Sequence, residues 1–450
     1  MSPYIRFART LFVFVLIAAF AAAAAAQETA AERIARQASL VTEFDVNGLK
    51  VIVKRRPSSP TVAGGLFVRG GVRNITEKNA GIENLMLLSA TDAGTDMPRQ
   101  QVRRELSRLG SGFSAAAGQD YSAVSFAATR PSFDRVWEIF SSVILKPAFA
   151  KEDVERNRQQ ILTQLREMET SPEGALQALQ DKTLYAAHPY PNEVIGTPAT
   201  IAALTPDDLR AYHKKVMQTS QLLLVFVGDL DANDVKARVA ATFGKLPRGD
   251  YKDQPLKTID FSKPTFDVTT RSLPTNYIQG AFAAPSIGDP DYYAMQLMIT
   301  ILHNLVVQKV RNELQLSYAP AAELNKFAVN TGEISVSTTD PNQAVEAMLA
   351  QIELLRTRRL NDAIVKDIAA SFLTSYYLGQ ETSGAQAGEL ARYELIGGGW
   401  RNSFEFLNNM MRVTSADVQR VSEKYMKNIR FTMVGDPQSA DRKVFMSSAF

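Results

Sequence analysis

Short apolar runs alternate with amphipathic stretches along both halves of the chain. The first half opens with two strand-like runs around Asn47 and Gly48, a dipeptide that strongly favours a hairpin turn. Other apolar runs predict strands, and runs with helical spacing of their apolar residues predict helices. The strands are expected at 44–54, 61–69, 112–118, 121–129, 277–283 and within 316–338, and the helices at 132–144, 151–170, 172–187, 290–314, 342–357, 361–377 and 383–397. This irregular alternation predicts an α+β fold with mostly antiparallel sheets, each covered by helices on one face.

A weak internal repeat relates the two halves. Residues 204–217 and 413–426 each include a threonine helix cap followed by a short amphipathic helix. An apolar strand that ends in Gly-Asp follows each of them, at 222–229 and 431–436. The duplication suggests two similar domains of about 200 residues, separated by a polar stretch that contains glycine and proline. We expect a first domain over 27–247, a linker over 248–265 and a second domain over 266–450.

The first residues have the pattern of a secretory signal peptide. Arg6 and Arg9 precede an unbroken apolar run of 16 residues, 11–26, which ends in small residues before the chain turns polar. A membrane-spanning helix needs about 20 residues, so we expect cleavage near Ala26, with an uncleaved anchor as the alternative. The chain has no cysteine, which excludes disulfides and a lipid-modified cysteine. The pattern therefore predicts a signal peptide over 1–26 and a periplasmic mature protein without a membrane span.

The composition is that of an ordinary globular protein, with 45% hydrophobic and 22% charged residues. The formal charge of +3 falls to about +1 when the two arginines of the signal peptide are removed. Lysine and arginine are scattered along the chain instead of clustered. A nucleic-acid partner is therefore not expected.

Candidate metal ligands are scarce. Three histidines are present, at 188, 213 and 303, and no two have the spacing of three or four that places both on one helix face. A catalytic zinc ion usually needs three ligands from His, Cys, Asp or Glu and an open position for water. The sequence also has no nucleophile-elbow, phosphate-binding or dinucleotide-binding motif. The chain alone is therefore not expected to bind a catalytic metal or to be active.

One segment nevertheless has the surroundings of a zinc-peptidase helix. It reads Gly81-Ile-Glu-Asn-Leu-Met-Leu-Leu-Ser-Ala-Thr-Asp-Ala-Gly-Thr95. It resembles the inverted-zincin family of insulinase, pitrilysin and mitochondrial processing peptidase, in which Gly-x-x-His-x-x-Glu-His leads to Gly-Thr. The resemblance places Asn84 at the first histidine, Leu87 at the catalytic glutamate and Leu88 at the second histidine. Residues 155–164 resemble the helix of the third ligand, and Gln164 stands where the zinc-binding glutamate belongs.

The resemblance implies a two-domain chain that forms half of a clamshell and has lost both its zinc ligands and its general base. Leucine has no lone pair to offer, and side-chain amides are poor ligands for zinc. The replacements also have a purely structural interpretation. The leucines make a buried helix more apolar, and Gln164 borders an apolar stripe as a core-edge amide.

A second family feature is retained. The segment from Val310 to Ala319 resembles Leu-Arg-Glu-x-x-Gly-Leu-x-Tyr, whose arginine and tyrosine face the cleft and, in two-subunit members, reach the partner's zinc site. The resemblance implies that Arg311 and Tyr318 hold the substrate backbone near the scissile carbonyl. The alternative is structural, because arginine suits a helix C-terminus and tyrosine often opens a strand. Gln315 stands in place of the family glycine.

The leading hypothesis is a non-catalytic subunit of a periplasmic heteromeric zinc metallopeptidase. A homologous zinc-binding subunit would form a heterodimer or higher assembly with this chain, which would hold no cofactor itself. Peptide or unfolded polypeptide would bind as an extra strand on an exposed sheet edge. The alternative hypothesis is a stand-alone pseudopeptidase that binds peptides or acts as a scaffold.

Overall fold

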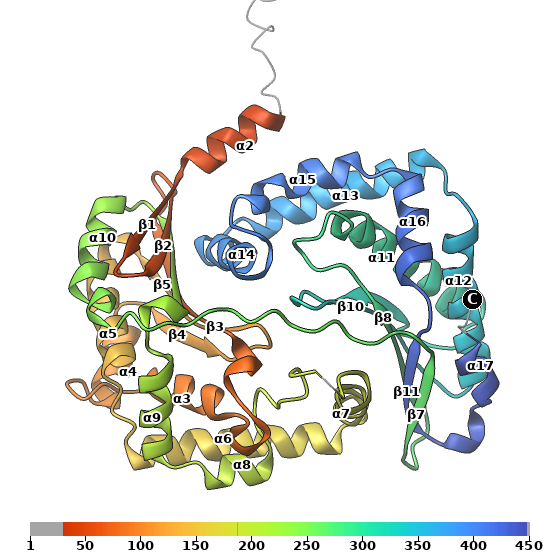
Figure 1. The fold of residues 1–450 in the computed structure, drawn as a ribbon, viewed down its shortest axis with the longest axis horizontal. Coiled ribbons are helices and arrows are strands. Elements are labelled where there is room, and N and C mark those ends of the chain that lie inside the picture. The colour runs from red at the N-terminus through yellow and green to blue at the C-terminus, as the bar shows by residue number, and fades with distance from the viewer. Residues whose placement is uncertain (1–29, 187, 448–450) are drawn as a thin grey trace, which may run out of the picture. The chain divides into compact units, whose positions relative to one another are not determined.

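The computed structural model describes residues 30–186 and 188–447 (Figure 1). Helix α2, Ala30–Ser39, belongs to a unit separate from the compact body that begins at Val41. The predicted signal peptide, residues 1–26, lies outside the described residues. Within the described part of the chain, none of the helices has the length and apolar character that crossing a membrane requires.

The first sheet has six strands in the order β1-β2-β6-β3-β5-β4. They are β1 Val41–Val46, β2 Leu49–Arg55, β3 Thr61–Arg69, β4 Gly112–Ala116, β5 Tyr121–Thr129 and β6 Leu222–Gly228. Strands β2 and β6 pair in parallel, and the other neighbours are antiparallel. The predicted hairpin is confirmed, because β1 and β2 meet at Asn47 and Gly48, whose φ angles are 55° and 87°. Positive φ at both positions matches the twist of the flanking strands.

The second sheet repeats this arrangement without a counterpart of β1. Its five strands lie in the order β7-β11-β8-β10-β9. They are β7 Thr265–Thr270, β8 Asn276–Ala283, β9 Ala321–Leu324, β10 Thr331–Thr338 and β11 Arg430–Gly435. Strands β7 and β11 pair in parallel, as β2 and β6 do, and the other pairs are antiparallel. Each strand of the second sheet therefore corresponds to one strand of the first.

The two segments identified as a repeat occupy equivalent places in these sheets. Helix α9, Pro206–Val216, leads to β6, and helix α16, Ser415–Tyr425, leads to β11. Thr205 and Thr414 cap the two helices, and each side chain accepts a hydrogen bond from the backbone N–H three residues further on. The repeat seen in the sequence is thus a repeat of the fold, while the expected domain boundaries stay a prediction.

Helices complete both halves and confirm the α+β fold class. Those before the predicted linker are α3 Ile82–Ala90, α4 Arg99–Arg108, α5 Phe133–Leu145, α6 Lys151–Thr170, α7 Pro172–Leu184, α8 Pro198–Ala203, α9 and α10 Ala232–Ala241. Those after it are α11 Tyr292–Val306, α12 Pro341–Thr357, α13 Asp362–Gly379, α14 Ser383–Ile396, α15 Asn402–Arg412, α16 and α17 Arg442–Met446.

The first sheet is covered on both faces, although helices were expected on one. On one face, Phe126 of β5 lies 5.0 Å from Phe140 of α5, measured between ring centroids. A Cβ on Gly64 of β3 would point to this face, against Phe126. The neighbouring Ala63 faces the other way, toward Gly384 of α14. Helix α14 from the second half therefore packs on β3, β5 and β6, and α7 from the first half packs on β7, β8 and β11 in return (Figure 1).

Partly buried carboxyl side chains lie where α7 meets the second sheet. Glu333 of β10 accepts a hydrogen bond from Gln180 Nε2 of α7 at 2.8 Å, and burial raises the pKa of Glu333. Burial also raises the pKa of the neighbouring Asp181 to about 6. A hydrogen bond from Gln177 opposes this shift, while the negative charges of Glu193 and Glu333 add to it.

We expect the Asp181→Asn variant to be more stable than the wild type at pH 8 and nearly equal to it at pH 4. The folded-state pKa of Asp181 lies above its ordinary value of 3.8, so the ionised carboxylate opposes folding at all pH values above about 6. The penalty shrinks as the pH falls from about 6 toward 3.8, because the folded-state carboxyl group is then protonated, and only a small part of it is left at pH 4. Urea unfolding should show a gain of up to about 3 kcal/mol at pH 8.

Asp207→Asn on α9 is the matched control. The Asp207 side chain is 90% exposed and forms a surface pair with Arg210. Its replacement should change the free energy of unfolding by less than about 0.5 kcal/mol at pH 8. If Asp181→Asn were also without effect at pH 8, the carboxylate of Asp181 would be solvated in the folded protein.

Candidate functional site

The helix that resembles a zinc-peptidase helix is α3, and close packing determines how it begins. Gly81 precedes it with a φ of 81°. A Cβ at this position would lie 2.6 Å from Ile201 Cδ1 and 2.7 Å from Gly196 Cα. Glycine is the residue that suits a left-handed position so close to another backbone. After α3, the N–H of Thr95 donates to the carbonyl of Lys146 at 2.8 Å. The surroundings of the motif therefore have structural roles that do not depend on zinc.

The positions on α3 that the resemblance assigns to zinc binding and catalysis are closed by packing. The Leu87 side chain is 1% exposed and belongs to the hydrophobic core of the first half. Leu88 is partly buried against the same core, and Asn84 is buried as well. The apolar interpretation of the two leucines agrees with this burial. A residue at position 87 faces other side chains and has no access to a water that it could activate.

Gln164 differs from its expected setting. It is exposed on α6, whereas a core-edge amide was expected. The α6 residue that bonds to α3 is Asn157, whose Nδ2 donates to Ser89 Oγ at 3.1 Å. The same Nδ2 donates to Asp92 Oδ2, just after α3, at 2.9 Å. Asn157 was not identified from the sequence, although its place on the apolar stripe of α6 was a signal for burial.

Glu83 is a buried acid that the sequence pattern did not reveal. It is 2% exposed and accepts hydrogen bonds from the hydroxyls of Ser122 and Tyr212 and from Asn74 Nδ2, the last at 3.3 Å. Burial raises the pKa of Glu83, and these hydrogen bonds oppose the shift. Its partners come from β5, from α9 and from the 3₁₀ helix Gly71–Asn74 that precedes α3. Glu83 therefore fixes the position of α3, and its oxygens are already engaged.

The donors in this region do not fit a zinc ion. Within residues 30–186 and 188–447, no group of three or more His, Asp or Glu side chains is placed to hold a metal. Two leucines and two amides at the former ligand and base positions cannot replace such a group. Each histidine makes a backbone hydrogen bond instead: His188 Nδ1 with the N–H of Tyr190 at 3.2 Å, His213 Nε2 with the carbonyl of Ile144 at 2.8 Å, and His303 Nδ1 with the N–H of Ala322 at 3.3 Å.

The retained arginine and tyrosine lie together at the surface of the second half. Arg311 belongs to η6, Val307–Glu313, a π-helical segment that continues α11. Its Cζ lies 4.2 Å from the centroid of the Tyr318 ring, which is the geometry of a cation–π contact. Tyr318 is 80% exposed, and Arg311 is exposed too. Beyond this stacking, the described residues provide no ion pair for Arg311 and no hydrogen bond for the Tyr318 hydroxyl.

The surroundings of this pair argue against the structural alternative for the tyrosine. Strand β9 begins at Ala321, so Tyr318 does not open a strand, and its exposure shows that it does not pack in the core. Gln315 has a φ of 55°, a left-handed conformation at the position of the family glycine. The turn that brings the pair together is therefore formed without glycine. No hydrogen bond or ion pair joins the pair to α3 or α6 in the described chain.

Two adjoining cavities lie along α14, and the first of them separates this helix from the first sheet. One has a volume of about 560 Å³ and is walled by β3, β4, β5 and α14. The other, of about 550 Å³, extends toward α11 and α13. Tyr121 and Gly388 line both cavities. Strand β4 is the outermost strand of the sheet, so the first cavity reaches an edge with free backbone donors and acceptors.

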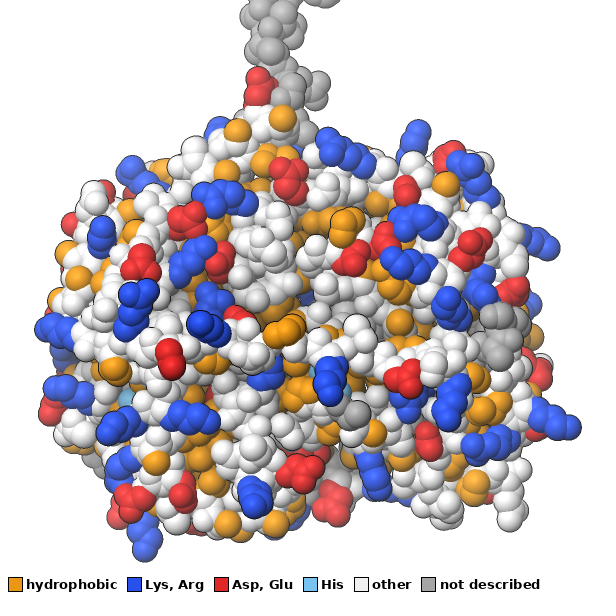
Figure 2. Space-filling model, viewed as in Figure 1, with side chains coloured by type: hydrophobic (Ala, Val, Ile, Leu, Met, Phe, Trp, Pro, Cys, Tyr) orange, Lys and Arg blue, Asp and Glu red, His pale blue; other side chains and the backbone are white. Residues whose placement is uncertain are grey.

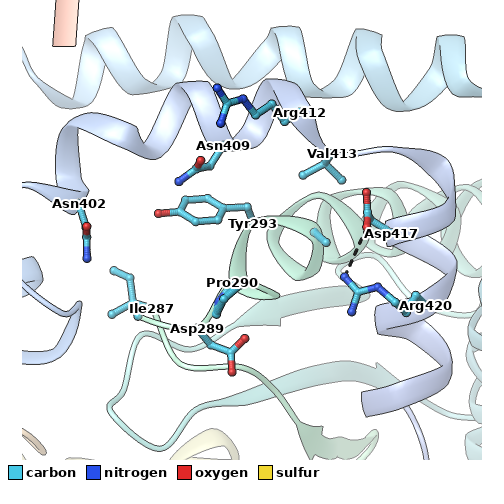
Figure 3. Close-up of a pocket in the computed structure, with 12 residues that line it drawn as sticks. Ile287, Asp289, Pro290, Tyr293, Asn402, Asn409, Arg412, Val413, Asp417 and Arg420 are labelled. Carbon is cyan, nitrogen blue, oxygen red and sulfur yellow. Dashed lines mark hydrogen bonds and ion pairs between the residues drawn. The ribbon is translucent and has the colours of Figure 1, made fainter. Parts of the chain in front are cut away.

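A further cavity of about 390 Å³ opens between α11, α15 and α16 (Figure 3). Arg412 and Arg420 line it together with Asp289 and Asp417. The Arg420 guanidinium lies 3.4 Å from a carboxylate oxygen of Asp417, a pair drawn in Figure 3, and 2.6 Å from Asp291. The charges of this cavity are balanced, so it favours neither an anionic nor a cationic ligand.

The surface drawn in Figure 2 has mixed charge. Basic and acidic side chains are interspersed over this face and do not gather into an area of one sign. A nucleic-acid partner normally needs a basic patch or stripe. The expectation that the chain does not bind nucleic acid stays a prediction.

Comparisons with known proteins agree with this arrangement. The family model of insulinase (peptidase family M16) matches residues 50–198, and that of the peptidase M16 inactive domain matches residues 203–372. An uncharacterized zinc protease of Mycobacterium leprae is 22% identical over 415 residues, which cover 89% of this chain and 92% of the relative. The beta subunit of the mitochondrial-processing peptidase of Saccharomyces cerevisiae is 20% identical over 412 residues, covering 86% and 89%.

The fold is also that of solved structures. A protease from Helicobacter pylori superposes with a TM-score of 0.80 at 16% sequence identity, covering 88% of this chain and 99% of that protein. Two family models thus match consecutive parts of the chain, and both sheets belong to one known architecture. The match to the inactive-domain model, together with the similarity to zinc proteases over most of the chain, gives the assignment: the chain is a non-catalytic, peptidase-like member of the insulinase family, peptidase family M16.

Proposed function

We propose that this chain is the non-catalytic subunit of a periplasmic, heteromeric zinc metallopeptidase. It would close a peptide-binding chamber and position the substrate for a homologous partner that carries the zinc. The proposal rests on the contrast between a buried position and an exposed pair of residues in the same chain. Position 87 is packed into the core, while Arg311 and Tyr318 stack on each other in solvent. Surface residues without a structural partner are candidates for binding another molecule.

Arg311 and Tyr318 have the chemistry that this role requires. A guanidinium and a phenol are hydrogen-bond donors, and both suit a carbonyl oxygen that gains negative charge when the peptide bond is attacked. The stacking on the ring orders the guanidinium, so less conformational freedom is lost on binding. The zinc chemistry itself would come from the partner.

The free edge of β4 supports the capture of a peptide by this chain. Residues Gly112, Ser114 and Ala116 are exposed, and β5 pairs with one side of the strand only. An extended peptide can add to such an edge through main-chain hydrogen bonds. The beta subunit of the mitochondrial-processing peptidase, to which this chain is similar, is named as one subunit of an assembly. The predicted signal peptide supports the periplasm as the compartment.

The proposal is tested with the purified chain and a homologous chain from the same genome that retains His-x-x-Glu-His. We expect the two chains to co-elute in size-exclusion chromatography and to hydrolyse a peptide together. Zinc analysis should find the metal in the partner. A partner variant with Gln in place of the motif glutamate serves as the control and should associate without activity.

Two results would contradict the proposal. Stoichiometric zinc and proteolysis by the lone chain would show that it is an enzyme with a different site. A chain that stays monomeric with every such homologue but binds peptides would be a stand-alone pseudopeptidase.

A further inference from the structure

The cavity next to β4 is lined by uncharged residues. Its volume is about 560 Å³, and none of the 15 residues that line it is charged. The adjoining cavity differs, because Lys326, Glu389 and Arg392 are among its lining residues. A ligand that spans both would meet an apolar end beside the sheet edge and a charged end farther in.

Small or absent side chains on both walls of the cavity create this space. The sheet contributes small residues at Ala63, Gly65, Ser125 and Ala127, and α14 contributes Gly384, Ala387 and Gly388. A Cβ added at Gly388, or at Gly112 of β4, would meet no atom within 4 Å. Glycine in the middle of a helix lowers its stability. The open space at Gly388 is therefore kept at the expense of helix stability.

The pleat of the sheet determines what can enter the cavity. Gly112 and Ser114 of β4 are exposed, line the cavity and lie two residues apart, so they share one face of the strand. A peptide strand paired with β4 would continue the sheet, and every second side chain of the peptide would fall on that same face. The cavity thus lies where alternate side chains of a bound strand would point.

We infer that this cavity receives alternate side chains of the captured peptide and selects for large apolar residues over charged ones. The inference rests on the proposed capture of peptides at β4 and adds a substrate class to it: extended segments with Leu, Met or Phe at every second position. Burial of one such side chain strengthens binding by about 10- to 100-fold, whereas a buried, unpaired charge weakens it.

The test measures peptide binding by the mature chain without any partner. The probes are short, fluorescein-labelled Thr/Ser peptides with blocked ends that carry Leu, or Asp, at alternate positions. Fluorescence anisotropy should give at least about tenfold tighter binding for the Leu peptide. Gly388→Leu fills the cavity from α14 and should reduce the affinity for the Leu peptide by at least about tenfold. The helix itself tolerates this change, since leucine is a better helix former than glycine.

Ala370→Leu is the matched control, because Ala370 is exposed on α13 and lines neither cavity. It should leave both affinities within about twofold. Equal affinity for the two peptides, or a Leu-peptide affinity that Gly388→Leu does not change, would overturn the cavity's role while peptide capture stands. If neither peptide binds, both the inference and the capture at β4 fail, and association with the partner remains a separate measurement.

Discussion

Arg311→Ala lowers the turnover number of the assembled two-chain enzyme by about 10²- to 10³-fold in our expectation, and Tyr318→Phe has an effect of similar size. Each change removes a donor that the proposed function places at the carbonyl oxygen. Such a donor matters most when the oxygen carries charge, so kcat should fall more than KM rises. Steady-state kinetics with a saturating partner and a defined peptide would measure both constants.

Because Arg311 and Tyr318 are exposed, their substitution can test activity without changing the stability of the chain. Tyr318 is 80% exposed, so neither substitution should change the urea midpoint of the chain. Lys309→Ala is the control, because Lys309 lies on the same segment η6 and forms only a surface pair with Glu313 at 2.9 Å. Its turnover should stay within about threefold of the wild type. Unchanged kcat in both Arg311→Ala and Tyr318→Phe would remove the pair from the reaction.

Local signals in the sequence were sufficient for much of the fold. Asn47 and Gly48 require a tight turn with positive φ, so the first hairpin could be placed to the residue. The threonine caps at 205 and 414 marked two helices and led to the repeat of the sheets. In each case neighbouring residues determine the structure, and no long-range packing is needed to interpret them.

Features that depend on distant residues could not be predicted. Glu83 looks like a surface acid in the sequence, but its hydroxyl partners lie 39 and 129 positions away. Helix α14 reads as an ordinary helix of the second half, yet it covers the first sheet. Gln164 was expected at the edge of the core because apolar residues flank it, whereas the polar link to α3 is made by Asn157. Periodicity indicates which face of a helix is apolar, and it does not identify the element that covers that face.

In the candidate site, too, some features could be predicted from local sequence and others depend on distant residues. The loss of the ligands at positions 84, 88 and 164, and of the general base at position 87, could be predicted from the motif alone. That Leu87 is part of the core, while Gln164 is exposed, needed the three-dimensional structure. We therefore expect a carboxylate introduced at position 87 to affect stability differently from one introduced at position 164.

We expect Leu87→Glu to lower the free energy of unfolding by about 4 kcal/mol or more at pH 8. Truncating a buried leucine already costs about 2.7 to 5 kcal/mol, and an unpaired carboxylate in the same place adds its own desolvation penalty. Burial would raise the pKa of the new carboxyl group, so the loss should become smaller as the pH falls from 8 toward the ordinary glutamate pKa of about 4.3. Urea unfolding at pH 8 and pH 5 measures the difference.

Two control variants separate the charge from the packing. Leu87→Met nearly conserves the volume and should cost less than about 1.5 kcal/mol. Gln164→Glu restores a carboxylate at the exposed position and should stay within about 0.5 kcal/mol of the wild type. If Leu87→Glu were as harmless as Gln164→Glu, water would reach position 87. The residue types alone, and not the packing, would then separate the chain from a catalytic one. A large loss at position 87 alone would mean that packing, as well as the missing residues, prevents a return to catalysis.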